Sequence, residues 1–125
     1  MYQNIILIGN LGRDPEMRYT TAGKAFTSFS LATTEMVWRP DTEPEPMTTW
    51  WNVTCWGKTA ERVHEKAHKG SKVLVEGRVK PGENGSPNIY IRKDNTPGAS
   101  YDLTASVVRM LDKKVDSDDD DGVPW

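Results

Sequence analysis

The chain of 125 residues is long enough for one domain with a short tail, and its net charge of −2 is unevenly distributed. Five of the 18 acidic residues lie in residues 115–125, which contain no basic residue, so residues 1–114 carry 16 basic and 13 acidic side chains, a net charge of +3. Only 36% of the residues are apolar and the mean hydropathy is −0.67, which predicts a small core and an unfolded segment.

The single cysteine, Cys55, excludes an intrachain disulfide and fits a reducing compartment. We expect it to pack rather than to react. No apolar run approaches the ~20 residues of a membrane span, and the first residues lack the basic segment of a signal peptide. We therefore expect a soluble, cytoplasmic protein with no membrane contact.

The first third of the chain predicts two strands. Residues 4–11 form an apolar run ended by Gly9 and Gly12, typical of a strand buried on much of its surface. Residues 13–19 predict a polar bend that can continue as a short strand, and residues 20–24 predict a turn. Residues 25–34 alternate, with Ala25, Thr27, Phe29 and Leu31 on one face, which predicts the second strand.

A proline-rich, acidic segment follows, and we expect an exposed hairpin loop over Met36 to Thr49. Trp38 and Arg39 stand at its beginning. An exposed tryptophan beside an arginine is either a packing lid or a stacking group.

Residues 50–57, WWNVTCWG, hold three of the five tryptophans and predict the third strand. Alternation places Trp51, Val53 and Cys55 on one face, which we expect to be core. Trp50 and Trp56 lie on the other face with Asn52 and Thr54 between them. Large rings on a partly polar face form a platform on which another flat group can stack.

The last half predicts one helix and two strands. Residues 58–69 predict a helix capped by Thr59 and ended by Gly70. Residues 72–80 alternate between apolar and polar side chains and predict a strand, with a bulge at Gly77. We expect Val73, Val75 and Val79 to point inward and Glu76, Arg78 and Lys80 to point outward. A second loop over residues 81–88 leads into a hairpin arm at 89–93 that carries Tyr90, a turn spans 95–98, and residues 101–108 form the last strand. That strand places Val107 on the same face as Leu103 and Ala105.

The predicted elements are five main strands with a helix between the third and the fourth, which indicates an all-β class. Short connections favour an antiparallel meander, and a small sheet avoids open edges by closing into a barrel. This order is that of an oligonucleotide- and oligosaccharide-binding (OB) barrel. We expect the five-stranded OB-fold domain at residues 1–111 and a disordered linker and acidic tail at 112–125.

Four blocks carry a resemblance to a known family: NIILIGNLGRDPEMRY at 4–19, FSLATTE at 29–35, TTWWNVTCWGKTAE at 48–61 and KGSKVLVEGRV at 69–79. In this order they resemble the bacterial single-stranded DNA-binding (SSB) protein family, over roughly residues 3–111 and at the C-terminal end. The resemblance implies sequence-independent binding of single-stranded DNA in replication, recombination and repair, at the nucleoid, by a homotetramer.

The resemblance also implies residue roles. The implied stacking residues are Trp38, Trp50 and Trp56, with Tyr90 as the candidate fourth ring. The candidate contacts to the DNA backbone are Lys58, Lys69, Arg78, Lys80 and Arg39, of which Arg78 and Lys80 also follow from strand parity. Trp51 matches a position at a contact between subunits, and plain core remains its alternative.

Residues 115–125, VDSDDDDGVPW, carry too much charge to fold alone. By resemblance, Asp118, Asp119, Asp120, Asp121, Pro124 and Trp125 bind replication and repair proteins, with Pro-Trp in place of the family's Pro-Phe ending. A solubilising end is the alternative.

Other functions fit the sequence less well. His64 to His68 matches the zinc-protease pattern HExxH, but the chain has no third histidine, so we expect no metal and no cofactor. A sugar-binding barrel would also use aromatic platforms, and a primosome-type adaptor would lack the tail. We find no catalytic constellation and expect a binding protein rather than an enzyme.

Overall fold

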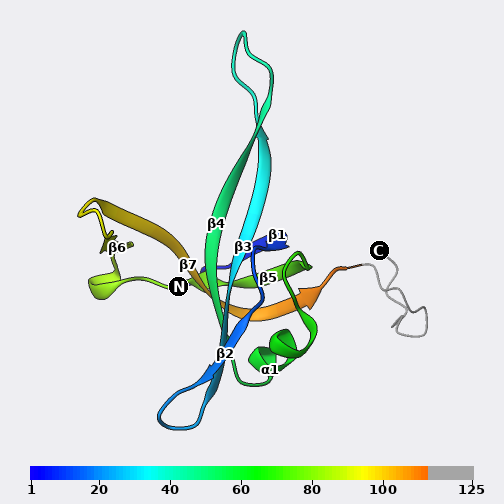
Figure 1. Ribbon diagram of the computed structural model, residues 1–125, viewed down its shortest axis with the longest axis vertical. Coiled ribbons are helices and arrows are strands. Elements are labelled where there is room, and N and C mark those ends of the chain that lie inside the picture. The colour runs from blue at the N-terminus through cyan, green and yellow to red at the C-terminus, as the bar shows by residue number, and fades with distance from the viewer. Residues whose placement is uncertain (113–125) are drawn as a thin grey trace.

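The computed structural model describes residues 1–112 of the chain. Figure 1 shows a small body from which a long β-hairpin and a shorter arm project in different directions. The elements are β1 (Ile5–Leu11), β2 (Glu16–Tyr19), β3 (Ala25–Val37), β4 (Glu45–Trp56), α1 (Gly57–Lys66), β5 (Lys72–Val79), the 3-10 turn η1 (Glu83–Gly85), β6 (Asn88–Ile91) and β7 (Pro97–Met110).

Five of these strands close into a barrel in the order β1-β5-β7-β4-β3, and β1 also pairs with β3 to complete the ring. The predicted five-stranded OB barrel is therefore confirmed. The expectation of a wholly antiparallel meander is wrong, because β4 and β7 pair in parallel. The helix and β5 lie between these two strands in the sequence, and a long connection of this kind lets a chain return in the same direction.

Alternating side chains build the barrel core. Phe29, Leu31, Val53, Cys55 and Leu103 all have 2% or less of their surface exposed. The inward faces predicted for the second and third strands are confirmed there. Burial raises the pKa of the Cys55 thiol to about 11, while a contact of its Sγ with the Thr27 carbonyl oxygen lowers it in part. The thiol is thus protonated at neutral pH and packs as an apolar group.

The helix α1 covers one end of the barrel (Figure 1). Its Ala60 and Val63 are buried, and the Ala60 carbonyl accepts a 2.8 Å hydrogen bond from Thr27 Oγ1 inside the core. The helix begins at Gly57 with Trp56 as its N-cap residue, so the predicted cap at Thr59 is wrong. It also ends before Gly70, which has a φ of +90° in the following turn rather than at the helix end.

The long hairpin extends the sheet well beyond the barrel. The strands β3 and β4 pair without interruption from Phe26 opposite Trp56 to Val37 opposite Glu45. The predicted loop over residues 36–49 is therefore wrong at residues 36–37 and 45–49, which belong to the strands, and only residues 38–44 lie outside them. Side chains also connect the two strands in this extension, since the hydroxyls of Thr34 and Thr48 form a 2.9 Å hydrogen bond across the ribbon.

The arm consists of β6 and the beginning of β7, which pair from Asn88 opposite Ser100 to Ile91 opposite Pro97. The hairpin arm predicted near residue 89 is confirmed. The predicted turn at 95–98 is displaced, because β7 already begins at Pro97 and not at residue 101.

A β-bulge resets the alternation of β7. Glu76 lies opposite Val107, whereas Gly77 lies opposite Ala105. Ser106 is therefore an extra residue, and the bulge lies on β7 rather than at Gly77. As a result Val108 is buried and Val107 is not, which corrects the predicted face of Val107.

Apolar residues of two strands that we expected to be buried lie at the surface. On β1, Ile5 and Leu7 pack against the core, but Ile6 and Ile8 are more than half exposed, so the expectation of a strand buried on much of its surface is wrong. In the described residues no layer covers the outer side of β1. Val79 has the predicted inward parity but lies at the end of β5, and it is half exposed.

No helix within residues 1–112 is long and apolar enough to cross a bilayer.

Candidate nucleic-acid interface

The outward side of β3 and β4, together with Trp38 beyond the end of β3, forms a surface that we call the aromatic face. Trp50 is 54% exposed and Trp56 38% exposed, while Val53 and Cys55 between them point into the core. This is the division into two faces that the alternation predicts. The rings are therefore available to a ligand.

Trp56 lies in a cluster with one residue of β3, Phe26, and one residue of the turn before β3, Lys24. Phe26 is its partner in the strand register, and the two ring centroids are 5.1 Å apart at 36°. Lys24 Nζ lies 5.2 Å from the Trp56 ring centroid, a cation–π contact. The backbone of Lys24 is bonded twice to Thr20, which holds the lysine at the end of the turn.

Trp50 reaches across the neighbouring strand. It lies opposite Ala32 in the register, and the rim of its indole rests against Gly12 after the end of β1. The small side chain of Ala32 leaves room for a ring to cross β3. The position of the indole thus depends on three strands.

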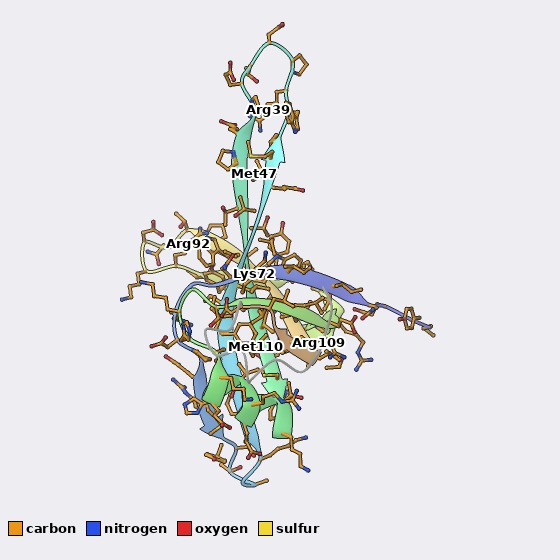
Figure 2. The ribbon with its side chains drawn as sticks, turned by 90° about the vertical axis from the view of Figure 1, so that its right-hand side faces the viewer. Arg39, Met47, Lys72, Arg92, Arg109 and Met110 are labelled. Atoms are coloured by element: carbon orange, nitrogen blue, oxygen red, sulfur yellow. The ribbon has the colours of Figure 1, made fainter. Side chains whose placement is uncertain are left out.

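Trp38 is 75% exposed beside the tip of the long hairpin. Arg39, labelled near that tip in Figure 2, forms a 3.3 Å ion pair with Glu45. Asp41 and Glu43 lie in the same loop. Arg39 is therefore already neutralised in part, and the tip around Trp38 is acidic rather than basic.

Tyr90 lies on the arm and is 44% exposed. Its ring covers Gly98, its partner on β7, and the guanidinium carbon of Arg92 lies 5.8 Å from the ring centroid. Arg92 also donates hydrogen bonds to the Pro97 carbonyl and to Thr96 Oγ1. Figure 2 shows Arg92 on the arm, which places a cation beside the fourth ring.

A carboxylate connects the arm to the aromatic face. Asp102 accepts hydrogen bonds from Asn52 Nδ2 at 3.0 Å and from Asn88 Nδ2 at 2.9 Å, one on each oxygen. Asn52 lies on β4 between the two tryptophans, and Asn88 begins β6. The two bonds hold the base of the arm against the barrel.

The predicted backbone-contact residues Lys58, Lys69, Arg78 and Lys80 are exposed. In residues 1–112 the ion pairs are Arg18–Glu16 and Arg39–Glu45, so none of these four cations has a carboxylate of the described residues within 4.0 Å. Lys58 follows Trp56 closely at the start of α1. Lys69 lies in the turn after α1, where its N–H donates to Asp14 Oδ1 at 2.8 Å.

Trp51 lies apart from the aromatic face. It is half-buried at the end of the barrel, its Nε1 donates to Thr33 Oγ1 at 3.1 Å, and its ring centroid is 5.2 Å from that of Tyr101. Tyr101 is largely exposed. Trp51 is thus core on one side and accessible on the other.

The HExxH pattern does not form one helical face. The helix α1 ends at Lys66, so His64 is helical, whereas His68 lies in the following turn with Nδ1 2.9 Å from the Lys69 carbonyl. The expectation that both histidines lie on the helix is wrong. Within the described residues no group of three or more His, Cys, Asp or Glu side chains is placed to hold a metal ion.

The predicted partner-binding residues Asp118, Asp119, Asp120, Asp121, Pro124 and Trp125 lie outside the described residues.

Comparison with known proteins relates the chain to a family. The model of the single-strand binding protein family matches residues 2–110. The chain belongs to this family. A single-stranded DNA-binding protein of Xanthomonas axonopodis pv. citri (strain 306) is 39% identical over 107 residues, which are 86% of this chain and 56% of the relative. One from Neisseria meningitidis serogroup A is 37% identical over the same length, 58% of the relative.

The chain spans somewhat more than half the length of these curated relatives. A solved structure titled small single-stranded DNA-binding protein from Streptomyces coelicolor matches with a TM-score of 0.70 at 22% identity, covering 86% of this chain and 93% of that one. At this identity the structural likeness supports the shared fold.

Several residues of this single-strand binding family protein escaped the sequence reasoning. Lys24, Phe26 and Arg92 contact the predicted rings, and Asp102 joins the arm to the barrel. Two of them had a usable signal, because alternation places Phe26 on the outward face of its strand and Arg92 on the same face as Tyr90 in the predicted arm. Lys24 and Asp102 depend on strand register and on turns, which bring together residues distant in sequence.

Proposed function

We propose that this protein binds single-stranded DNA without sequence preference and protects it in replication, recombination and repair. The observation that carries the proposal is the pair of exposed indoles, Trp50 and Trp56, on the outward side of a closed OB barrel. Membership of the single-strand binding protein family supports it. Each base stacked on an aromatic side chain contributes ~1–3 kcal/mol, and every base has a π-face, so stacking does not select sequence.

We assign stacking roles to Trp38, Trp50, Trp56 and Tyr90. Trp56 and Trp50 are six residues apart on β4, and Trp38 lies six residues beyond Ala32, the partner of Trp50. At about 3.3 Å per residue these steps correspond to roughly 20 Å each along the ribbon. A bound strand would therefore follow the long hairpin away from the barrel, with Tyr90 on the arm as a separate contact.

Phosphate contacts come from the exposed cations Lys58, Lys69, Arg78 and Lys80, with Arg39 weakened by its ion pair. To these we add Lys24 beside Trp56 and Arg92 beside Tyr90. A cation next to a stacking ring can neutralise the phosphate of the stacked nucleotide. Each such contact releases counterions, so affinity falls as salt rises.

One barrel offers few rings, so tight binding favours several barrels on one strand, and we propose a homotetramer. The exposed apolar side chains Ile6 and Ile8 on β1 support a surface that another subunit covers. Trp51 and the exposed Tyr101 beside it form a second candidate for a subunit contact.

We further propose that residues 1–111 form the DNA-binding domain and that residues 112–125 recruit replication and repair proteins. Four aspartates at 118–121 followed by Pro124 and Trp125 would offer charge to basic residues and an apolar tip to a pocket. A protein with these partners would act at the nucleoid in the cytoplasm.

The test is a titration of tryptophan fluorescence with oligo-dT at two salt concentrations, with duplex DNA and a chitin or cellulose oligosaccharide as controls. We expect quenching by oligo-dT alone and an affinity that falls with salt by a logarithmic slope of about −0.7 for each phosphate contacted. Quenching by the oligosaccharide but not by oligo-dT would identify a sugar-binding barrel instead. Light scattering on the same samples reports the number of subunits.

A further inference from the structure

We propose that Gly12 and Gly98 are positioning residues of the interface, because each provides the space against which one exposed ring rests. The inference rests on the proposed function, since it concerns how two of the rings assigned to DNA stacking are held. Neither glycine contacts DNA in this proposal. Each acts through its ring, Gly12 through Trp50 and Gly98 through Tyr90.

A side chain at position 12 would collide with Trp50. A Cβ built there would lie 2.5 Å from Cζ3 and 2.8 Å from Cη2 of the indole, and the three nearest heavy atoms all belong to this ring. The backbone of Gly12 is outside the left-handed region, so alanine can adopt its conformation. Its N–H donates to the Ser30 carbonyl at 3.0 Å, which holds the glycine in place. The ring therefore has to move if a methyl group is added.

The arm repeats this arrangement. Gly98 lies opposite Tyr90 in the register, and a Cβ there would lie 2.6 Å from Cε2 and 2.7 Å from Cζ of the ring. It would also lie 3.0 Å from the guanidinium carbon of Arg92. Aromatic rings commonly cover glycines across a strand pair, and here the ring buries a residue of an otherwise exposed arm. A methyl at 98 would displace the tyrosine and the arginine together.

Two other glycines show that this is not a general property of the fold. A Cβ at Gly9 would collide with the backbone of Ala32, and one at Gly77 with the backbone of Thr104. Backbone in a closed barrel cannot yield, so substitution there should disrupt the fold. At positions 12 and 98 the obstructing atoms are the ends of side chains, which can rotate away. An alanine there should leave the barrel intact and move the ring.

Double-mutant cycles test the proposal on the full chain. The variants are Gly12→Ala, Trp50→Ala and both together, and Gly98→Ala, Tyr90→Ala and both together, titrated with oligo-dT at low salt. We expect Gly12→Ala and Gly98→Ala each to weaken binding by roughly fivefold or more, which corresponds to the smallest loss expected for one stacked base. When the ring that the glycine positions is already replaced by alanine, the same glycine substitution should change the affinity by less than about twofold. The cross combinations, Gly12→Ala with Tyr90→Ala and Gly98→Ala with Trp50→Ala, serve as matched controls. They should show nearly the full effect of each glycine substitution, because the ring that the glycine positions is still present.

A measurement without DNA separates ring position from folding. In the free protein, Gly12→Ala should shift the indole N–H resonance of Trp50 more than those of the other tryptophans and leave the urea midpoint nearly unchanged. Gly9→Ala should lower the midpoint. A Gly12→Ala variant that binds oligo-dT as tightly as the unaltered protein, or that loses as much affinity without Trp50 as with it, overturns the inference. If Trp50→Ala itself does not lower the affinity for oligo-dT, the stacking role of Trp50 in the proposed function is contradicted, rather than the positioning role of Gly12.

Discussion

Neighbouring tryptophans have opposite environments in this protein. A β-strand points successive side chains to opposite sides, so Trp50 lies on the aromatic face and Trp51 at the end of the barrel. Trp50 is more than half exposed and its indole rests against Gly12, whereas Trp51 is half-buried and hydrogen-bonded to Thr33. Both residues are tryptophans, so their different environments come from their alternate positions on the strand.

This difference predicts opposite effects of the same substitution. Trp50→Ala should lose ~1–3 kcal/mol of oligo-dT binding free energy, because one stacked base is lost, with little change in stability. Trp51→Ala should lower the free energy of unfolding by about 2 kcal/mol, because it removes half-buried ring area and the hydrogen bond that Thr33 Oγ1 accepts from the indole. Fluorescence titration and urea denaturation measure the two effects. The prediction fails if Trp51→Ala impairs binding at unchanged stability while Trp50→Ala does not.

The arm, formed by β6 and the beginning of β7, projects from the barrel (Figure 1). Its connection at residues 92–96 is held by Asp94, whose Oδ1 accepts hydrogen bonds from Thr96 Oγ1 at 2.6 Å and from the Thr96 N–H at 3.1 Å. These bonds to Thr96 hold the pKa of the exposed Asp94 carboxyl below its ordinary value. The carboxylate is thus bound more strongly in the folded turn than in an unfolded chain.

The direction of this pKa shift predicts how the arm responds to acid. The stabilisation by Asp94 is complete above the ordinary pKa and is lost as the pH falls through the lower pKa of the folded state. Acidification below about pH 4 should therefore loosen the turn, seen as faster amide exchange and a shift of the Thr96 amide resonance. Asp94→Asn should abolish this pH dependence. An unchanged Thr96 resonance down to pH 2.5 in the unaltered protein would contradict the role of Asp94.

At the scale of the molecule, charge is divided between a basic body and an acidic segment. Residues 1–114 carry a net charge of +3 and residues 115–125 carry five aspartates. About ten flexible residues have a root-mean-square span of roughly 16–19 Å, so a flexible acidic segment would remain close to the barrel. It would then compete with DNA phosphates for the exposed lysines and arginines.

Removal of residues 116–125 should therefore increase the affinity for oligo-dT at low salt. The gain should disappear near 1 M salt, because the Debye length falls from about 30 Å at 0.01 M to about 3 Å at 1 M. Replacement of the five aspartates by asparagine is the matched control, since it keeps the length and removes the charge. A truncated protein without higher affinity at low salt would contradict competition by the segment.

Local patterns predict much of this molecule and miss the features that depend on pairing. Alternation assigns the buried Phe29, Leu31 and Val53, because the side chains of a strand alternate whatever lies next to it. It fails after the bulge at Ser106, which depends on the register with β5. It also fails at Ile6 and Ile8, because an apolar run predicts a strand but not which of its sides another element covers.

Residue order and alternation alone determined the existence and order of the five main strands, the barrel class and the outward placement of Trp50 and Trp56. These follow from backbone geometry within single segments and from the number and length of the connections. Only the tertiary structure decided that Gly12 supports Trp50, that Lys24 lies over Trp56 and that Asp102 joins the arm to the barrel. Those contacts join residues whose distance in space is set by strand register and barrel closure, and neither is encoded in any one stretch of the chain.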